Sequence, residues 1–521
     1  MRYPDIPETA REPQGSAAPI EKEAQSPSDS PGAKPPLKLI LRLCEALMQE
    51  NINYCHWKSN NALDRSASGE NDLDLLISRA DFARFTALLF RLGFKEAAAP
   101  PDKQLPGVMD FYGHDRPSGG LVHVHAHYQL VMGHDLTKNV RLPIEAAYLS
   151  SAVQDGLFRV PGREFEFIVL VIRLILKHAT WDVILGKDGP IRKSERQELE
   201  FLQERVDRKR VNEILSQNLP YVSAELFQRW VDALRPGAPV SARIRAGREL
   251  QRVLEAGSRQ PPMRDALQKQ WRRWAKFISR RVLRSRSRHR LSAGGAMIAI
   301  VGGDGSGKTT TVESLYAWLS RDFDTLRVHL GKPRESVGTI VIRAVLRTGQ
   351  LIGLYPHLNS VSPYLSDSGR RFPFSGRIPW MIRDAMKSRD RYLAYLRARR
   401  FVNNGGIVIC DRFPLPQIKR MDGPSVEQIA AGNTSRLAAL LVRFERRYYQ
   451  AITPPELVIV LRLDPDEAVR RKTEEDAAQV HARSAEIWET DWRGSGMRAV
   501  DTNGPREEVL AEVKALVWSQ L

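Results

Sequence analysis

The chain has 521 residues, a length typical of about two to four globular domains. Of these residues 42% are hydrophobic and 27% are charged, a composition that excludes a fibrous, collagen-like or wholly disordered protein. Three cysteines at unrelated spacings exclude a disulfide framework and a cysteine-based zinc site. The net charge of +18 lies largely in one short segment, so a nucleic-acid partner is not expected from charge alone. With no secretion signal and no apolar stretch of the ~20 residues that span a bilayer, we expect a cytoplasmic protein.

Residues 1–36 contain eight prolines among Ser, Glu, Lys and Ala. Such a segment cannot bury enough apolar surface to offset its conformational entropy, so we predict a disordered tail. Residues 37–260 then mix helical and strand periodicity and predict an α+β domain. Its expected elements are helices over 37–50, 81–94, 167–178 and 194–215, and strands over 71–78 and 122–131.

Acidic and imidazole side chains mark the two expected strands of this domain. Asp72 and Asp74 are two residues apart and therefore lie on one strand face, where two carboxylates can share a divalent metal bound to a nucleoside triphosphate. His123, His125 and His127 share a strand face in the same way. They form either a transition-metal site or a polar groove filled by histidines.

A basic segment over 261–295 follows. Between Arg264 and Arg290 there are eleven Lys or Arg and one acid. An apolar stripe at helical spacing runs along this segment and consists of Leu267, Trp271, Trp274, Ile278 and Val282. We expect this stripe to be buried against a flanking domain. The alternative is docking of residues 264–290 on an anionic membrane, peripheral to its inner face, and nucleic acid is the least favoured partner.

From residue 296 to 521, short apolar strands alternate with helical sequence, which predicts a parallel sheet with helices on both faces. The first strand runs into a phosphate loop of the form G-x-x-x-x-G-K-[ST]. Its residues are Gly302, Gly303, Asp304, Gly305, Ser306, Gly307, Lys308 and Thr309, and Thr310, which follows directly, is also expected to contact the nucleotide. Glycines let backbone N–H groups surround phosphate oxygens, Lys308 reaches the β- and γ-phosphates of ATP, and the Thr309 hydroxyl ligates Mg²⁺.

Two further groups of charged residues belong to this predicted catalytic region. Asp411 and Arg412 end an apolar strand, at the sheet edge where ligands bind in open parallel sheets. Asp411 could hold Mg²⁺ or accept a hydroxyl proton, and Arg412 could grip an anionic substrate. Arg470 and Arg471 follow a later strand, either as a lid over the transferring phosphoryl group or as an exposed helix face.

Four segments of this region together resemble thymidylate kinase and its P-loop nucleotide-kinase relatives. They are GGDGSGKTT, the strand followed by DRF, PPELVIVLRLDPDEAVRRK and AVDTNGPREEVLAEV. The resemblance implies that Lys308 binds ATP phosphates, Asp411 lies near Mg²⁺, Arg412 holds the acceptor phosphate, and Arg470 and Arg471 are lid arginines. It also implies that Arg389 or Arg391 contacts the acceptor. The thymidine-pocket residues after DRF are replaced by PLPQIKRMDGPSV, and an extra stretch lies around 360–380.

Residues 37–130 resemble the small nucleotidyltransferase-fold domains found with polysaccharide-cluster proteins, with Trp57-Lys58-Ser59 in place of Gly-Ser. That family needs a third carboxylate, and His123 stands at its expected position. The domain is therefore either an active nucleotidyltransferase or a binding or scaffolding relic.

The expected function is ATP- and Mg²⁺-dependent phosphoryl transfer to a nucleoside monophosphate or a related phosphorylated small molecule. The alternatives are a kinase for a sugar or glycan intermediate in surface-polysaccharide synthesis, and an adaptor that binds ATP without transferring its phosphate. The oligomeric state stays open.

Overall fold

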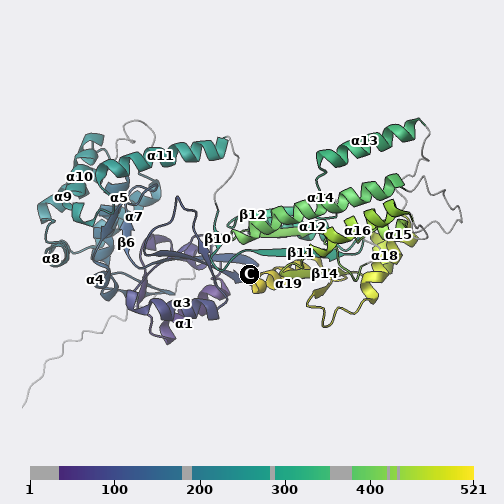
Figure 1. The fold of residues 1–521 in the computed structure, drawn as a ribbon. Coiled ribbons are helices and arrows are strands. Elements are labelled where there is room, and N and C mark those ends of the chain that lie inside the picture. Colours follow the sequence, from purple (N-terminus) through teal and green to yellow (C-terminus); the bar gives the residue numbers. More distant parts are fainter. Residues whose placement is uncertain are drawn as a thin grey trace, which may run out of the picture.

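The computed structural model describes residues 34–178, 191–281, 288–331, 333–352, 378–418, 423–430 and 435–521. Most of the predicted tail, most of the extra stretch around 360–380 and Val282 lie outside these ranges. The described chain forms two lobes that meet near the C-terminus (Figure 1). None of its helices is long and apolar enough to cross a membrane.

The first lobe is built on a mixed six-stranded sheet with the order β1-β2-β5-β4-β3-β10. Its strands are β1 (Tyr54–His56), β2 (Leu73–Ile77), β3 (Lys95–Ala98), β4 (Val108–Asp115), β5 (Gly120–His127) and β10 (Arg290–Leu291). The β2–β5 pair is parallel, and the other neighbouring pairs are antiparallel. The strand predicted over 71–78 is confirmed as β2 and lies beside β5, whereas the strand predicted over 122–131 ends at His127, and Leu130 and Val131 belong to β6 in another sheet.

Helices of the first lobe form two apolar cores. α1 (Lys38–Gln49) and α3 (Phe82–Arg91) share one core with the sheet, and α5 (Arg163–His178) runs through the centre of the other. The remaining elements are η1 (Asn60–Ala62), α2 (Leu63–Ala67), η2 (Arg79–Asp81), β6 (Leu130–Met132), β7 (Val140–Leu142), α4 (Glu145–Ser150), β8 (Val153–Asp155), β9 (Phe158–Val160), α9 (Ala224–Leu234), α10 (Val240–Val253) and η3 (Glu255–Gly257).

The single helix predicted over 194–215 is wrong, because the structure has two helices there. α7 (Lys193–Arg205) ends before an extended Val206, and α8 (Arg208–Asn218) begins after Asp207. The Asp207 carboxylate accepts a hydrogen bond of 2.8 Å from the backbone N–H of Lys209. This N-cap gives α8 a separate start, which charge and periodicity alone did not indicate.

The basic segment forms α11 (Pro262–Arg281), but the expected burial of its apolar stripe is wrong for the described residues. Leu267, Trp271 and Trp274 are 69%, 73% and 64% exposed. The opposite, polar face contacts the first lobe instead, where Asp265 is buried and Arg272 donates to the carbonyl of Leu136. α11 is therefore amphipathic with its apolar side turned to solvent.

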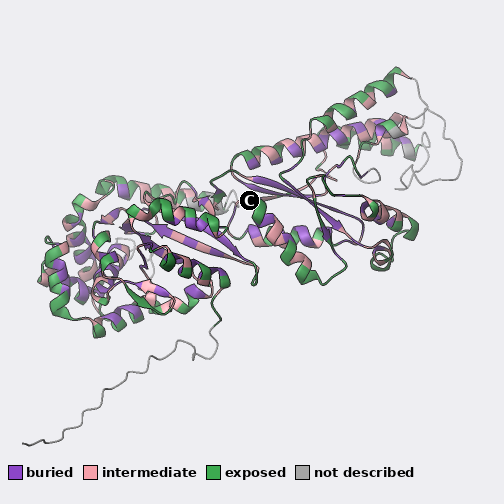
Figure 2. Ribbon diagram, turned by 90° about the horizontal axis from the view of Figure 1, so that it is seen from below, coloured by how far each residue is buried: buried purple, intermediate pink, exposed green. Residues whose placement is uncertain are grey.

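The second lobe is a five-stranded parallel sheet with the order β12-β13-β11-β14-β15. The strands are β11 (Ala296–Gly302), β12 (Thr325–His329), β13 (Ile407–Asp411), β14 (Leu457–Arg462) and β15 (Arg498–Asp501). Burial is nearly continuous along β11, β13 and β14, as expected for strands covered on both faces (Figure 2). The predicted α/β fold with a parallel sheet is confirmed.

Helices cover both faces of this sheet. α12 (Lys308–Leu319) and α19 (Arg506–Gln520) share one apolar cluster with it, and α14 (Ile378–Asn403) shares another with the opposite face. The other helices are α13 (Val337–Leu351), α15 (Val426–Ile429), α16 (Arg436–Gln450), α17 (Pro465–Arg471) and α18 (Ala477–Glu489).

The two lobes share a core. Ala97 and Tyr112 from the first sheet and Leu291 from β10 belong to the same buried cluster as α12 and α19. Trp518 of α19 donates its indole N–H to the carbonyl of Gly93 at 2.9 Å. Side chains far apart in the sequence thus hold the lobes together through apolar burial and a partly buried hydrogen bond.

Candidate functional site

The phosphate loop lies between β11 and α12, at the carboxyl edge of the parallel sheet. Gly305 and Gly307 have φ angles of +76° and +81°, which an L side chain rarely adopts. A Cβ at Gly303 would lie 2.8 Å from the Ser484 hydroxyl. The glycines are therefore required by backbone conformation and by close approach.

Polar side chains fill the interior of the loop. The Ser306 hydroxyl donates to the Gly303 carbonyl at 2.8 Å, and the Lys308 ammonium donates to the same carbonyl. Both side chains are buried, whereas Thr309 is exposed and Thr310 is half-buried. The arrangement places one cation within the loop and one hydroxyl at the start of α12, where the positive end of the helix favours anions.

Asp304, at the third position of the loop, forms an ion pair with Arg483 of α18. Its carboxylate lies 3.0 Å from Arg483 Nη1. Burial would raise the pKa of Asp304, but the Arg483 hydrogen bond and the Lys308 charge hold it below its usual value. Arg483 was missed by the sequence analysis, because nothing in the sequence around it distinguishes it from an arginine on the exposed face of a helix.

Asp411 ends β13, the strand next to β11. It pairs in register with Ile300 of β11 and His329 of β12. Its buried carboxylate lies 3.6 Å from Arg327 Nη2 and 3.9 Å from His329 Nε2. The acid is therefore held at the carboxyl edge of the sheet beside two groups that can carry positive charge.

Arg412 follows with a left-handed backbone, φ +64°, which is rare for a residue other than glycine, asparagine or aspartate. Its N–H donates to the Ile300 carbonyl at 3.1 Å, so the chain leaves the sheet in a sharp turn directly after Asp411. Strained backbone of this kind is concentrated at functional sites.

The two expected lid arginines end α17. Both pair with Glu467, Arg470 at 2.7 Å and Arg471 at 2.9 Å. The Cβ of Arg471 lies 3.5 Å from the point where a Cβ on Gly305 would stand, so Arg471 borders the phosphate loop. Arg470 is the more exposed of the two.

Arg391 of α14 lies at the end of β12. Its Nε donates to the Leu330 carbonyl at 2.7 Å, and its Nη2 donates to the Gly331 carbonyl at 3.3 Å. Arg389 is half-buried two positions earlier. Of the two arginines that the resemblance implied, Arg391 is the one whose guanidinium is fixed at the carboxyl edge of the sheet.

The predicted acidic and imidazole residues of the first lobe also come together. Asp72 Oδ1 lies 3.0 Å from His123 Nδ1, and Asp74 Oδ1 lies 3.0 Å from His125 Nδ1. His127 Nε2 lies 3.2 Å from His125 Nδ1. The shared faces expected for β2 and β5 are thus observed as contacts across the parallel pair.

A third carboxylate, which the sequence analysis missed, completes this cluster. Asp110 of β4 stands opposite His125 in the antiparallel register. Its Oδ1 lies 2.8 Å from His123 Nε2. The sequence analysis placed His123 at the expected position of the third acid and did not consider an acid from another strand. The acid comes from the strand on the other side of β5, and β4 was not among the predicted elements.

Hydrogen bonds and charge pairs engage every carboxylate of this cluster. Lys58 Nζ lies 2.7 Å from Asp74 Oδ1. Burial disfavours the charged form of His123, yet hydrogen bonds to Asp110 and Asp72 raise its pKa to about 9. Burial would raise the pKa of Asp110, but hydrogen bonds from His123 and His289 lower it strongly. The cluster is thus an alternation of negative and positive groups.

No family model matches the chain. The uncharacterized ATP-binding protein YghR of Escherichia coli (strain K12) is 27% identical over 232 residues, which cover 42% of this chain and 86% of that protein. The uncharacterized ATP-binding protein YghS of the same strain is 27% identical over 231 residues, covering 42% of this chain and 92% of that protein. Among solved structures, a thymidylate kinase from Ehrlichia chaffeensis aligns with 43% of this chain and 99% of its own, at 15% identity and a TM-score of 0.25.

Proposed function

We propose that the second lobe binds ATP and transfers its terminal phosphoryl group to a small-molecule acceptor. The observation that carries this proposal is the convergence, at one sheet edge, of a complete phosphate loop, Asp411 and the Arg471 and Arg483 side chains. A protein that only binds ATP needs the loop and a magnesium ligand but not further arginines at the same sheet edge. Relatives named for ATP binding further support nucleotide binding.

Each residue has a chemical task in this proposal. Lys308 neutralises charge on the β- and γ-phosphates, and the loop backbone orients them. Arg471 and Arg470 close toward the transferring group, and Arg412 grips the acceptor. Positioning and charge stabilisation are the main contributions that a protein makes to phosphoryl transfer.

The residues present also fit a magnesium ion. Thr309 is an exposed hydroxyl at the first turn of α12, and Asp411 supplies a carboxylate oxygen at the adjacent strand. Magnesium prefers oxygen ligands of this kind and, when bound, neutralises charge on the phosphate oxygens.

The favoured acceptor is a nucleoside monophosphate or a related phosphorylated small molecule. Arg391 supports an anionic acceptor, because its guanidinium is fixed at the same sheet edge as Asp411. A sugar or glycan intermediate is the alternative acceptor, since the first lobe resembles domains found with polysaccharide-cluster proteins. The residues after Phe413 depart from the thymidine-pocket pattern, which weakens the case for thymidylate.

Labelled ATP, Mg²⁺ and a panel of nucleoside monophosphates, sugars and glycan lipids test the proposal with the full-length protein. We expect one acceptor class to become labelled. Lys308→Ala should abolish this transfer, and the surface variant Lys38→Ala on α1 should retain it. ATP binding without labelling of any acceptor would favour the adaptor instead, and wild-type transfer by Lys308→Ala would contradict the assignment of the loop.

A further inference from the structure

Asp110, His123 and His289 form a compact group of possible metal ligands outside the phosphate loop. One oxygen of Asp110 and one ring nitrogen of each histidine all lie within 4.8 Å of one another. Ligand atoms around one Zn²⁺ ion, bound at about 2.0–2.2 Å, lie about 3–4 Å apart. Small side-chain rotations would therefore bring all three onto a single ion.

His289 links this group to the other lobe. Its backbone N–H donates to the Asp322 carbonyl at 3.1 Å, and its carbonyl accepts from Asp324 at 2.8 Å, so its main chain is fixed beside α12 and β12. Its side chain reaches back to the first sheet, with Nε2 3.6 Å from Asp110 Oδ2. The group is thus assembled from two strands of one lobe and a segment held by the other.

Both histidines are oriented by hydrogen bonds at their other ring nitrogen. Tyr112 Oη lies 3.2 Å from His289 Nδ1, and Asp72 Oδ1 lies 3.0 Å from His123 Nδ1. The Tyr112 and His123 rings also stack at 4.4 Å. Metal-ligating histidines almost always have such a partner, which fixes the tautomer and the ring direction. In both cases the nitrogen left facing Asp110 is Nε2.

Two imidazoles and one carboxylate favour a transition metal over Mg²⁺, which prefers an all-oxygen shell. The neighbouring triad of Asp74, His125 and His127 is the weaker candidate. There, the Lys58 ammonium already lies 2.7 Å from the Asp74 carboxylate.

We propose that Asp110, His123 and His289 bind a divalent transition-metal ion of the Zn²⁺ class and thereby fasten the two lobes at their junction. The three protein ligands leave a fourth tetrahedral position for water or an anionic ligand.

Calorimetric titration of the chelator-treated full-length protein with Zn²⁺ tests this site. We expect a site that His289→Ala weakens at least tenfold and that Tyr112→Phe weakens by about tenfold, as for loss of an orienting partner. The matched control is His481→Ala, because His481 is an exposed histidine of α18 whose Nε2 lies 3.7 Å from Asp466 Oδ1, outside the proposed site. Circular dichroism and ATP binding verify that each variant is folded.

Equal Zn²⁺ affinity in wild type and His289→Ala would overturn the proposal, as would the absence of Zn²⁺ binding in the wild type. Zn²⁺ binding that depends on Asp74, His125 and His127, but not on His289, would also overturn it, in favour of the neighbouring triad.

A different observation concerns the surface of α11, whose apolar side faces solvent. Met263, Phe277 and Ile278 are exposed along with the stripe residues already described. At ~25 cal/mol per Å², uncovered apolar groups of this size are costly in water. Because the polar side of α11 is held by the first lobe, the helix cannot rotate to bury them without losing those contacts.

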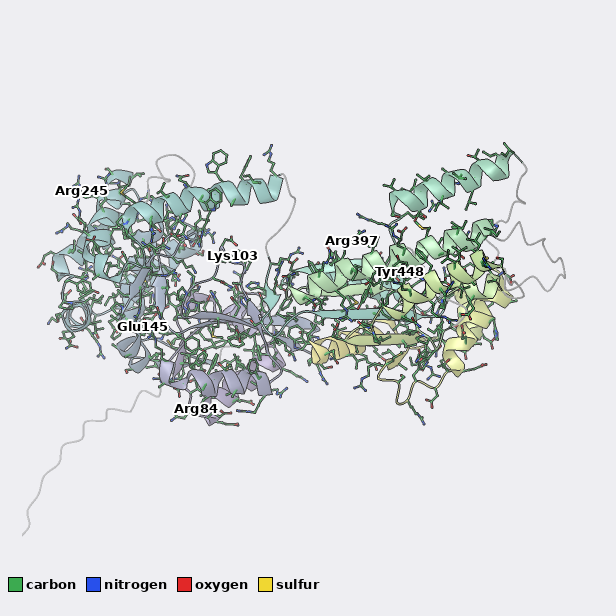
Figure 3. All side chains as sticks on the ribbon, viewed as in Figure 1. Arg84, Lys103, Glu145, Arg245, Arg397 and Tyr448 are labelled. Atoms are coloured by element: carbon green, nitrogen blue, oxygen red, sulfur yellow. The ribbon has the colours of Figure 1, made fainter. Side chains whose placement is uncertain are left out.

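α13 repeats this pattern on the second lobe. Val337, Ile340, Val341 and Val345 are exposed, while Thr339 is buried and donates to Asp390 at 2.6 Å. α11 and α13 lie along the same edge of the molecule, and their side chains project from it (Figures 1 and 3). Large exposed apolar patches mark interaction surfaces.

The charge of the two helices indicates that their partner is an anionic surface. Lys269 and Arg272 are held on the side of α11 that contacts the first lobe, and α11 has five further basic residues and no further acid. α13 has two arginines and no acid, and its Arg343 pairs with Glu335. Trp271 and Trp274 suit the boundary between lipid headgroups and acyl chains, and each nearby cation adds about 1 kcal/mol on an anionic surface.

We propose that α11 and α13 dock together on an anionic membrane surface. Sedimentation with vesicles of phosphatidylglycerol and phosphatidylcholine tests this with the full-length protein. We expect binding that requires the anionic lipid, weakens with salt and falls at least tenfold for Trp271→Ala/Trp274→Ala. The matched control is Trp488→Ala, because Trp488 lies on α18 and not on this edge.

Two outcomes would overturn the membrane proposal. One is the absence of binding to anionic vesicles at low salt. The other is a concentration-dependent dimer in solution that the Trp271→Ala/Trp274→Ala change dissociates, because it would assign the apolar side of α11 to a second copy of the chain.

Discussion

The two charged clusters of this protein are built in opposite ways. The phosphate loop is a contiguous run of residues whose function depends on glycine conformations and a buried lysine. The Asp–His cluster of the first lobe draws its side chains from strands β2, β4 and β5 and from His289. The residues of the phosphate loop are therefore adjacent in the sequence, whereas those of the Asp–His cluster come together only when the sheet and the lobe junction have formed.

The two clusters also differ in how their charges are balanced. Around the phosphate loop, Asp304 is paired with Arg483 and further cations border the sheet edge, which favours an anionic ligand. In the first lobe, Asp74 is paired with the Lys58 ammonium and Asp110 with His123, whose pKa is raised, so these carboxylates already have positive partners. A comparison of variants in each region should therefore separate loss of an anion site from loss of a cation site.

The largest expected effect is on the junction that joins the two regions. Trp518→Ala removes a buried indole and its hydrogen bond to Gly93, so we expect the free energy of unfolding to fall by about 3–5 kcal/mol. Chemical denaturation measures it. Trp518→Phe should recover most of the loss, and two independent unfolding transitions unchanged by Trp518→Ala would show that the lobes are not coupled.

The next effect concerns chemistry in the second lobe alone. Asp411→Asn should leave ATP binding nearly intact and lower phosphoryl transfer by about 100-fold or more, in the range of a lost acid–base group. Rapid-quench turnover and nucleotide titration measure the two quantities separately. Wild-type turnover in this variant would remove Asp411 from the catalytic machinery.

A smaller effect is expected at Arg483, whose role no local motif indicates. Arg483→Ala leaves the buried Asp304 carboxylate without its ion-pair partner beside the phosphates, so we expect ATP affinity to fall by about tenfold. The matched control is Arg470→Ala on the same side of the sheet, which should lower turnover more than affinity. Restored affinity in Arg483→Ala/Asp304→Asn would support the charge explanation.

The smallest effect is a pH dependence confined to the first lobe. Burial of Glu166 raises its pKa to about 7, although Asn60 donates a hydrogen bond to it at 2.7 Å. The folded state then holds the Glu166 proton more tightly than the unfolded chain does. The contribution of protonated Glu166 to the free energy of unfolding is therefore fully present below about pH 4.5 and is lost as pH rises through about 7. Glu166→Gln should flatten the dependence of Tm on pH between 5 and 8 and raise Tm by a few degrees at pH 8. A variant as pH-dependent as wild type would contradict this account.

Local sequence was sufficient for much of the second lobe. The strand before the phosphate loop, the glycines and the acid that ends β13 all follow from short patterns, because a buried parallel strand and a phosphate turn each impose their residue types locally. Local sequence does not show which helices contact each other, and the role of Arg483 was therefore missed. Its position beside Asp304 depends on how α18 folds back over the loop.

The first lobe shows the limit more clearly. Alternation in β2 and β5 placed Asp72, Asp74 and the three histidines on shared strand faces, and the structure joins them. The third acid, Asp110, could be identified only from the order of the strands, in which β5 lies between β2 and β4. The side on which each strand pairs depends on the whole sheet and not on any one strand.

By itself, the sequence determined which elements form and which of their faces carry apolar, acidic or basic side chains, since these follow from period and residue type. Tertiary structure decided what each face meets. It turned the apolar side of α11 to solvent and its polar side to the first lobe, and it brought His289 to Asp110 across the junction. The physical reason is that amphipathicity specifies a difference between two faces, while the partner of each face is set by packing among segments far apart in the chain.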